Sequence, residues 1–148
     1  MDAARIQALL PWRYPFLMID RLLVCTPHDF IAMIKRVTAA DPVVGGSEMA
    51  GTWFPAMLLF EGMSQSAALL YTLSYGNGGP VELPLLGFFD GHLEGSAAVG
   101  ESVRYDVRSQ KMTRTAGVFS AEAHAAERRI ARAELAFAMA RDEEGPKT

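Results

Sequence analysis

An acidic residue, Glu61, stands near the middle of a long apolar stretch that runs from Phe54 to Leu73. A stretch of this length predicts a helix that must be covered on nearly every side. Gln65 follows four residues later, so the two polar side chains lie on one face of that helix. Because burial of an unpartnered carboxylate is costly, we expect this face to line a cavity, a subunit contact or a reaction site.

The segments on either side of this helix predict strands. Two short apolar runs, Phe16 to Val24 and Phe30 to Val37, flank the turn residues Thr26 to Asp29, which is typical of a hairpin. Further strand-like segments are Glu82 to Leu93, Val103 to Arg108, Val118 to Ala125 and Ile130 to Ala140. Two strands, one long apolar helix and about four more strands favour an α+β fold, in which one antiparallel sheet packs on the helix.

The size and composition of the chain exclude several classes of protein. At 148 residues, the chain is expected to form one domain over residues 1–148, with a polar tail from about residue 142. A single cysteine, Cys25, excludes an internal disulfide and a multi-cysteine zinc site, which favours a reducing, cytoplasmic location without metal. Glu61 and Gln65 argue against a membrane span. A net charge of −3 without a basic, aromatic-interleaved motif argues against nucleic-acid binding.

Positive charge is unevenly distributed along the chain. No Lys or Arg occurs from Val37 through Val103. The later cations are Arg104, Arg108, Lys111, Arg114, Arg128, Arg129 and Arg132. We expect most of these arginines to lie on a solvated face of the sheet, although such a cluster could also meet an acidic protein.

Two segments of the chain carry a resemblance to a known family. Residues 10–21 read Leu-Pro-Trp-Arg-Tyr-Pro-Phe-Leu-Met-Ile-Asp-Arg, and residues 55–65 place Glu61 and Gln65 one helical turn apart. Both segments resemble the FabZ-like β-hydroxyacyl-ACP dehydratases, and the resemblance extends from Leu10 to Met139. It implies a hot-dog fold, in which one curved antiparallel sheet wraps around a long central helix. It also implies a homodimer or a higher oligomer.

The resemblance implies a chemistry for this helix. In this family a histidine of one subunit and a glutamate of the other remove water from a 3-hydroxyacyl thioester, without a cofactor or a metal ion. The substrate would be bound to acyl carrier protein or to CoA, and Glu61 falls on the catalytic acid. The expected substrate-binding residues are Trp53, Pro55, Ala56, Gln65 and His92.

The chain departs from the family at the catalytic histidine. The family's loop reads Gly-His-Phe-Pro-Gly-His-Pro-x-Met-Pro-Gly, and in the aligned segment from Gly46 to Ala56 the catalytic histidine position holds Gly51. Glycine offers no acid or base, so another group must act with Glu61. His92 is the candidate for a displaced base.

Other titratable residues are weaker candidates for this second group. Glu48 and Asp41 could supply a second carboxylate, whereas His28 and His124 are expected at the surface. A further departure is the segment from Asp90 to Gly95, where the family carries cations that dock the acidic carrier protein. Docking of a carrier protein is therefore expected to differ from that of the family.

Three functions remain open at this level. The leading hypothesis is a 3-hydroxyacyl-thioester dehydratase that uses Glu61 with a replacement partner, in fatty-acid or polyketide and polyene biosynthesis. The second is a non-catalytic hot-dog subunit that forms a heterodimer with a histidine-bearing dehydratase. The third is an acyl thioesterase, in which Glu61 activates water.

Overall fold

The structure, a computed structural model, describes residues 1–44, 53–76 and 84–140. The helices are α1 (Ala3–Leu9) and α2 (Ala56–Tyr75), and the strands are β1 (Arg21–Thr26), β2 (Phe30–Arg36), β3 (Pro84–Leu93), β4 (Ser102–Met112), β5 (Ala116–Ala125) and β6 (Arg128–Met139). Several features expected from the sequence lie outside the described residues: Glu48, Gly51, the strand start at Glu82 and the polar tail from residue 142.

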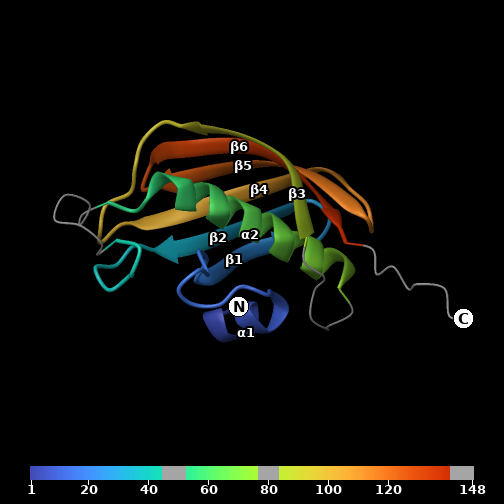
Figure 1. Cartoon of the computed structure of the whole chain (residues 1–148), viewed down its shortest axis with the longest axis horizontal. Helices are drawn as coiled ribbons and strands as arrows, with labels where there is room; N and C mark the ends of the chain where they lie inside the picture. The colour runs from blue at the N-terminus through green and yellow to red at the C-terminus, as the bar shows by residue number, and fades with distance from the viewer. Residues whose placement is uncertain (45–52, 77–83, 141–148) are drawn as a thin grey trace, which may run out of the picture.

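The six strands form one antiparallel sheet in the order β1-β2-β4-β5-β6-β3. Figure 1 shows α2 running across one face of this sheet, with α1 beside β1. The long helix contacts β2, β3, β4, β5 and β6. The expected α+β architecture, one sheet packed on a long helix, is therefore confirmed, and four strands do follow the helix.

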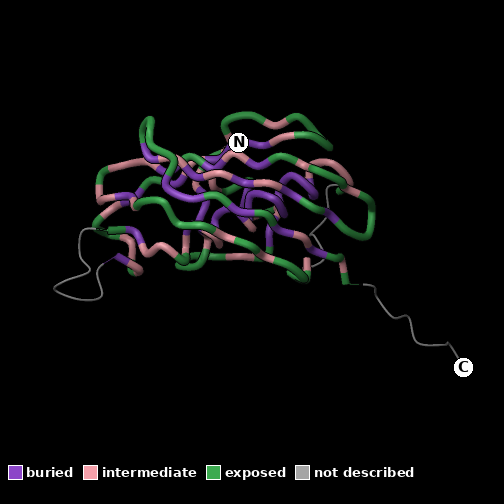
Figure 2. The backbone as a smooth tube through the Cα atoms, turned by 90° about the horizontal axis from the view of Figure 1, so that it is seen from above, coloured by how far each residue is buried: buried purple, intermediate pink, exposed green. Residues whose placement is uncertain are grey.

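The core lies between α2 and the sheet. Leu59, Met63 and Leu70 of the helix are fully buried, and so are Val107 and Phe119 of the sheet. Figure 2 shows the buried stretches in the middle of the molecule and the exposed ones mainly toward its ends and edges. Burial of these side chains is the main favourable contribution to folding.

The alternation of apolar and charged residues in the sequence places them on opposite faces of the sheet. Along β4, Val103, Tyr105 and Val107 are buried toward α2, whereas Arg104 and Arg108 are exposed on the other face. Successive side chains of a strand point to opposite faces of the sheet. The sheet therefore has an inner face toward α2 and an outer face that carries charge.

The first strand begins five residues later than the sequence suggested. A strand was expected from Phe16, but β1 begins at Arg21. The Gln65 side chain explains the difference, because its Oε1 accepts a hydrogen bond from the Met18 N–H at 2.8 Å and its Nε2 donates one to the Phe16 carbonyl at 2.8 Å. The backbone at residues 16–18 is bound to α2 and not to a neighbouring strand.

Candidate active site

The start of α2 is fixed by the chain that joins β3 to β4. Phe54 N–H donates to the Ala97 carbonyl at 2.8 Å, and Trp53 forms a β-bridge with Ala98. The helix begins immediately after Pro55, which has no side chain that can cap its first turn. The N–H groups of the first turn, which begins at Ala56, therefore have no side-chain acceptor at the N-cap. They can donate to an acceptor atom of a ligand instead.

Glu61 and Gln65 lie side by side on α2, as their spacing predicted. Gln65 Nε2 donates to Glu61 Oε1 at 2.9 Å. Gln65 is fully buried, whereas Glu61 is half-buried. With both ends of its amide bonded to the backbone at Met18 and Phe16, Gln65 is a fixed donor that orients the Glu61 carboxylate.

A second polar cluster lies on the inner face, next to the N-terminal segment. Lys35 is 6% exposed and pairs with Asp41 at 3.1 Å and with Asp20 at 3.7 Å. Asp41 also accepts a hydrogen bond from the Thr38 N–H at 3.1 Å. The Asp41 carboxylate is thus occupied by its own turn and by a buried cation, which leaves it poorly suited to serve as the second catalytic carboxylate.

Tyr105 of β4 packs against α2 at Gly62, the residue after Glu61, and sequence reasoning did not find it. The residue is fully buried. A Cβ on Gly62 would overlap the tip of its ring. Burial raises the pKa of the Tyr105 phenol, and the carboxylates of Asp20 and Glu61 raise it further. The phenol is therefore neutral and can donate a hydrogen bond.

The three histidines of the chain lie away from Glu61. His28 packs edge-on against Tyr75 at the far end of α2, with 4.7 Å between the ring centroids. His92 is exposed on the outer face, because its neighbour Gly91 faces Phe60 of α2 and side chains alternate along β3. His124 is also on the outer face, but it is half-buried. One chain therefore does not bring His92 to Glu61.

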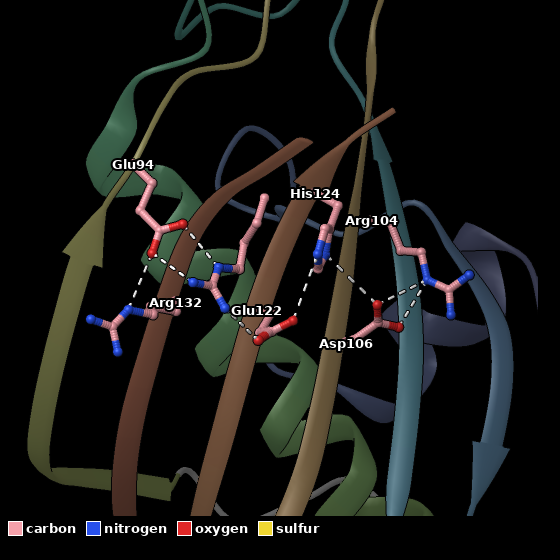
Figure 3. A network of polar contacts seen from close by, with 7 residues as sticks. Glu94, Arg104, Asp106, Glu122, His124 and Arg132 are labelled. Atoms are coloured by element: carbon pink, nitrogen blue, oxygen red, sulfur yellow. Dashed lines mark hydrogen bonds and ion pairs between the residues drawn. The ribbon is translucent and has the colours of Figure 1, made fainter. Parts of the chain in front are cut away.

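The outer face of the sheet carries a network of paired charges (Figure 3). Arg129 binds both oxygens of Glu94, at 2.9 and 3.0 Å, and also reaches Glu122 at 3.0 Å. His124 lies between Glu122 and Asp106, at 3.6 and 3.9 Å. Hydrogen bonding to Arg129 lowers the pKa of Glu94. The expectation that most of the arginines lie on a solvated sheet face is confirmed.

This network lines a groove of about 750 Å³ on the outer face. Its walls include Arg104, Asp106, Arg132 and Glu134. Opposite charges alternate in the groove and mostly pair with each other, as in the Arg104 to Asp106 contact at 2.8 Å. Since the groove lies on the face of the sheet opposite α2 and Glu61, we assign the candidate active site to the Glu61 side.

The described residues contain no group of three His, Cys, Asp or Glu side chains placed to hold a metal ion. No helix among them is long and apolar enough to cross a membrane.

Cys25 is partly buried on β1, and burial raises the pKa of its thiol. A reactive thiolate would need the opposite shift, so Cys25 is not a candidate nucleophile.

The chain is similar in sequence to known dehydratases. No protein-family model matches the chain. A 3-hydroxyacyl-(acyl-carrier-protein) dehydratase FabZ of Desulforamulus reducens is 32% identical over 139 residues, which cover 94% of this chain and 97% of the relative. The FabZ of Shewanella loihica is 33% identical over 125 residues, which cover 83% of this chain and 82% of the relative.

Two solved structures illustrate the similarity in fold. The dehydratase heterocomplex ApeI:P from Xenorhabdus doucetiae aligns with a TM-score of 0.79 at 12% identity, covering 94% of this chain and 93% of the other. A hot-dog-like protein from Thermanaerovibrio acidaminovorans aligns with a TM-score of 0.63 at 17% identity, covering 80% and 86%. The expected hot-dog fold is confirmed.

Proposed function

Because the chain belongs to the FabZ family of 3-hydroxyacyl-(acyl-carrier-protein) dehydratases, we propose that it is a hydro-lyase acting on 3-hydroxyacyl thioesters of acyl carrier protein or CoA. The observation that carries the proposal is the half-buried Glu61 carboxylate, oriented by the fully buried Gln65 on the same face of α2. An oriented carboxyl group that still reaches solvent suits proton transfer with a bound substrate.

In the proposed reaction, the Glu61 carboxyl donates a proton to the 3-hydroxyl group, which leaves as water. A second group takes the proton from C2, and the electrons of that C–H bond form the 2,3 double bond of the enoyl product. The N–H groups of the uncapped first turn at Ala56 would stabilise the charge that develops on the thioester oxygen. Trp53 is half exposed next to this turn and would contact the acyl chain or the carrier arm.

A second candidate function follows from the positions of the histidines. His28, His92 and His124 all lie away from Glu61 within one chain, and the resemblance aligns Gly51 with the family's histidine. The second group would then come from another subunit. The solved ApeI:P structure is that of a dehydratase heterocomplex. By analogy, this chain would contribute Glu61 or a tunnel wall to a site shared with a histidine-bearing dehydratase.

The edge strand β3 is the surface that we propose for this assembly. It is the last strand of the sheet, and its exposed apolar side chains are Leu85, Leu86, Phe88 and Leu93. Trp53 and Met57, at the start of α2, are also exposed. An unpaired strand edge with exposed apolar side chains favours pairing with another chain. The partner is a second copy or a homologous hot-dog subunit, in the cytoplasm where acyl carrier protein would be met.

We expect Leu86→Lys to weaken this assembly, because a lysine on an edge strand opposes strand pairing. The measurement is the mass in solution by light scattering after size-exclusion chromatography. Val118→Lys is the matched control, since Val118 is also exposed but lies on the internal strand β5. Dimers that persist in the Leu86 variant and dissociate in the Val118 variant would place the interface on the outer face instead.

The function is tested by the hydration of a series of trans-2-enoyl-ACP thioesters, which is the reverse reaction. The purified protein is assayed alone and mixed with a histidine-bearing relative. Hydration by the protein alone supports the first candidate, and hydration gained only in the mixture, above that of the relative alone, supports the second. Release of free thiol from an acyl thioester would instead indicate a thioesterase. Absence of thioester binding in both samples would refute the proposed function.

A further inference from the structure

Tyr105 reaches the helix that carries Glu61 through a gap left by a glycine. Its side chain points from β4 to the inner face, where Val103 and Val107 are also buried. The tip of the ring lies where a side chain on Gly62 would begin. Gly62 is the residue after Glu61, so the absence of a side chain at Gly62 lets the phenol come close to the backbone of the catalytic turn.

The Tyr105 hydroxyl is fully enclosed and forms no hydrogen bond with any of the described residues. A buried polar group without a partner is costly, so such groups in native proteins are nearly always bonded to protein or to ordered water. The ring tip lies against Gly62, the residue next to Glu61, and the carboxylates of Asp20 and Glu61 both raise the pKa of the phenol. Both are acceptors, and the protonated phenol is a donor.

Each carboxylate accepts one hydrogen bond from the protein. Asp20 Oδ2 accepts the Arg36 N–H at 2.7 Å, and Asp20 Oδ1 lies 3.7 Å from Lys35 Nζ. Glu61 Oε1 accepts from Gln65, whereas its Oε2 receives no hydrogen bond from the described part of the chain. A water molecule shared by Tyr105, Asp20 and Glu61 would have three polar partners, as buried waters typically do.

We propose that Tyr105 is a positioning residue for Glu61, whose hydroxyl donates through a buried water to the Glu61 carboxylate, with Asp20 as the third partner of that water. This inference rests on the proposed function for its catalytic consequence. Tyr105 is fully buried under α2, so it would act on the reaction through Glu61 and not by direct contact with substrate. Together with Gln65, it would hold the Glu61 carboxylate from two sides and limit it to one orientation.

The first test is a crystal structure of the full chain at a resolution that shows ordered water, for the wild-type protein and for Tyr105→Phe. We expect a water within about 2.6–3.2 Å of both the Tyr105 hydroxyl and the Glu61 carboxylate. In the variant that water is lost and the Glu61 side chain takes more than one rotamer. A hydroxyl bonded only to protein atoms, or an unchanged Glu61 in the variant, would overturn the proposal.

The second test is kinetic and uses the assembly that hydrates enoyl thioesters. For Tyr105→Phe we expect kcat to fall about tenfold, the factor that corresponds to one hydrogen bond, with KM unchanged. A change in the pH–rate profile should accompany this fall in kcat, because a hydrogen bond donated to a carboxylate favours its ionised form. Tyr75→Phe is the matched control: it removes a hydroxyl that donates to the Met112 carbonyl at 3.0 Å, at the other end of α2.

A purely structural Tyr105 would give a different result. Removal of a hydroxyl that has no partner would raise the midpoint temperature of thermal unfolding and leave kcat and the pH–rate profile unchanged. That outcome contradicts the proposal. The crystallographic test needs no turnover, so an absence of hydration in every assembly would refute the proposed function while the role of Tyr105 is still judged from the orientation of Glu61.

Discussion

Replacement of Glu61 by glutamine should lower kcat for enoyl-thioester hydration by about 10²- to 10⁴-fold, the range expected when a general acid or base is lost. The amide removes the proton-transfer group but keeps an oxygen that can accept the hydrogen bond from Gln65, which spans 2.9 Å in the wild-type protein. The fold should therefore be retained. The measurement is hydration of a trans-2-enoyl-ACP under saturating substrate, with thermal unfolding of the same sample.

Glu127→Gln provides the matched control for this prediction. Glu127 is exposed in the turn between β5 and β6, so the same change of charge there should leave both kcat and stability near wild-type values. A Glu61→Gln protein that is folded and still hydrates at the wild-type rate would show that this carboxyl group is not the acid. Another residue would then have to carry the reaction.

Replacement of Gln65 by leucine should cost roughly 2–4 kcal/mol of unfolding free energy. The reason is that Gln65 is fully buried and is the hydrogen-bond partner of two backbone groups, the Met18 N–H and the Phe16 carbonyl, each at 2.8 Å. Leucine would leave these groups without that partner. The measurement is urea unfolding. In the folded variant, the segment at residues 16–20 should be released from α2.

Gln65→Glu separates the two roles of this amide. It can still accept from Met18, but it cannot donate to Phe16 when ionised, and it places a second carboxylate beside Glu61. The introduced carboxyl should therefore have a folded-state pKa above the roughly 4.3 of an unfolded glutamate. The contribution of the protonated carboxyl group to the free energy of unfolding is present below about pH 4, and it is lost as the pH rises through the folded-state pKa.

The two Gln65 variants should consequently differ in their pH dependence. The loss of unfolding free energy caused by Gln65→Glu should shrink as the pH falls. The loss caused by Gln65→Leu should not, because leucine introduces no group that can be protonated. Gln110→Leu, on the exposed side of β4, is the control and should change the unfolding free energy by less than about 0.5 kcal/mol. Equal effects at positions 65 and 110 would contradict the assigned anchoring role.

Local patterns in the sequence were sufficient for most of the secondary structure. The apolar stretch around Glu61 predicted α2, and alternation at Val103 to Arg108 predicted the inner and outer faces of β4. The start of β1 was predicted wrongly, because the apolar run from Phe16 has strand-like composition. Its backbone is instead taken up by Gln65, a residue 47 positions after Met18, and no local pattern reports such a contact.

The candidate site, like the secondary structure, was predicted from the sequence only in part. Spacing alone placed Glu61 and Gln65 on one helical face, and the structure joins them by a hydrogen bond. The alternation of β4 implied that Tyr105 points inward, but its position under Gly62 depends on how the helix crosses the sheet. The same crossing separates His92 from Glu61, because the sheet lies between them.

The sequence by itself determined the helix, the strand faces and the chemical character of Glu61, because each depends on the periodicity of neighbouring residues. Only the tertiary structure decided what surrounds that carboxylate. The Gln65 amide is held by the backbone at residues 16–18, and Tyr105 lies in the gap at Gly62, which are contacts between segments far apart in the chain. Such contacts are set by the packing of α2 across the sheet, and packing is a property of the whole fold.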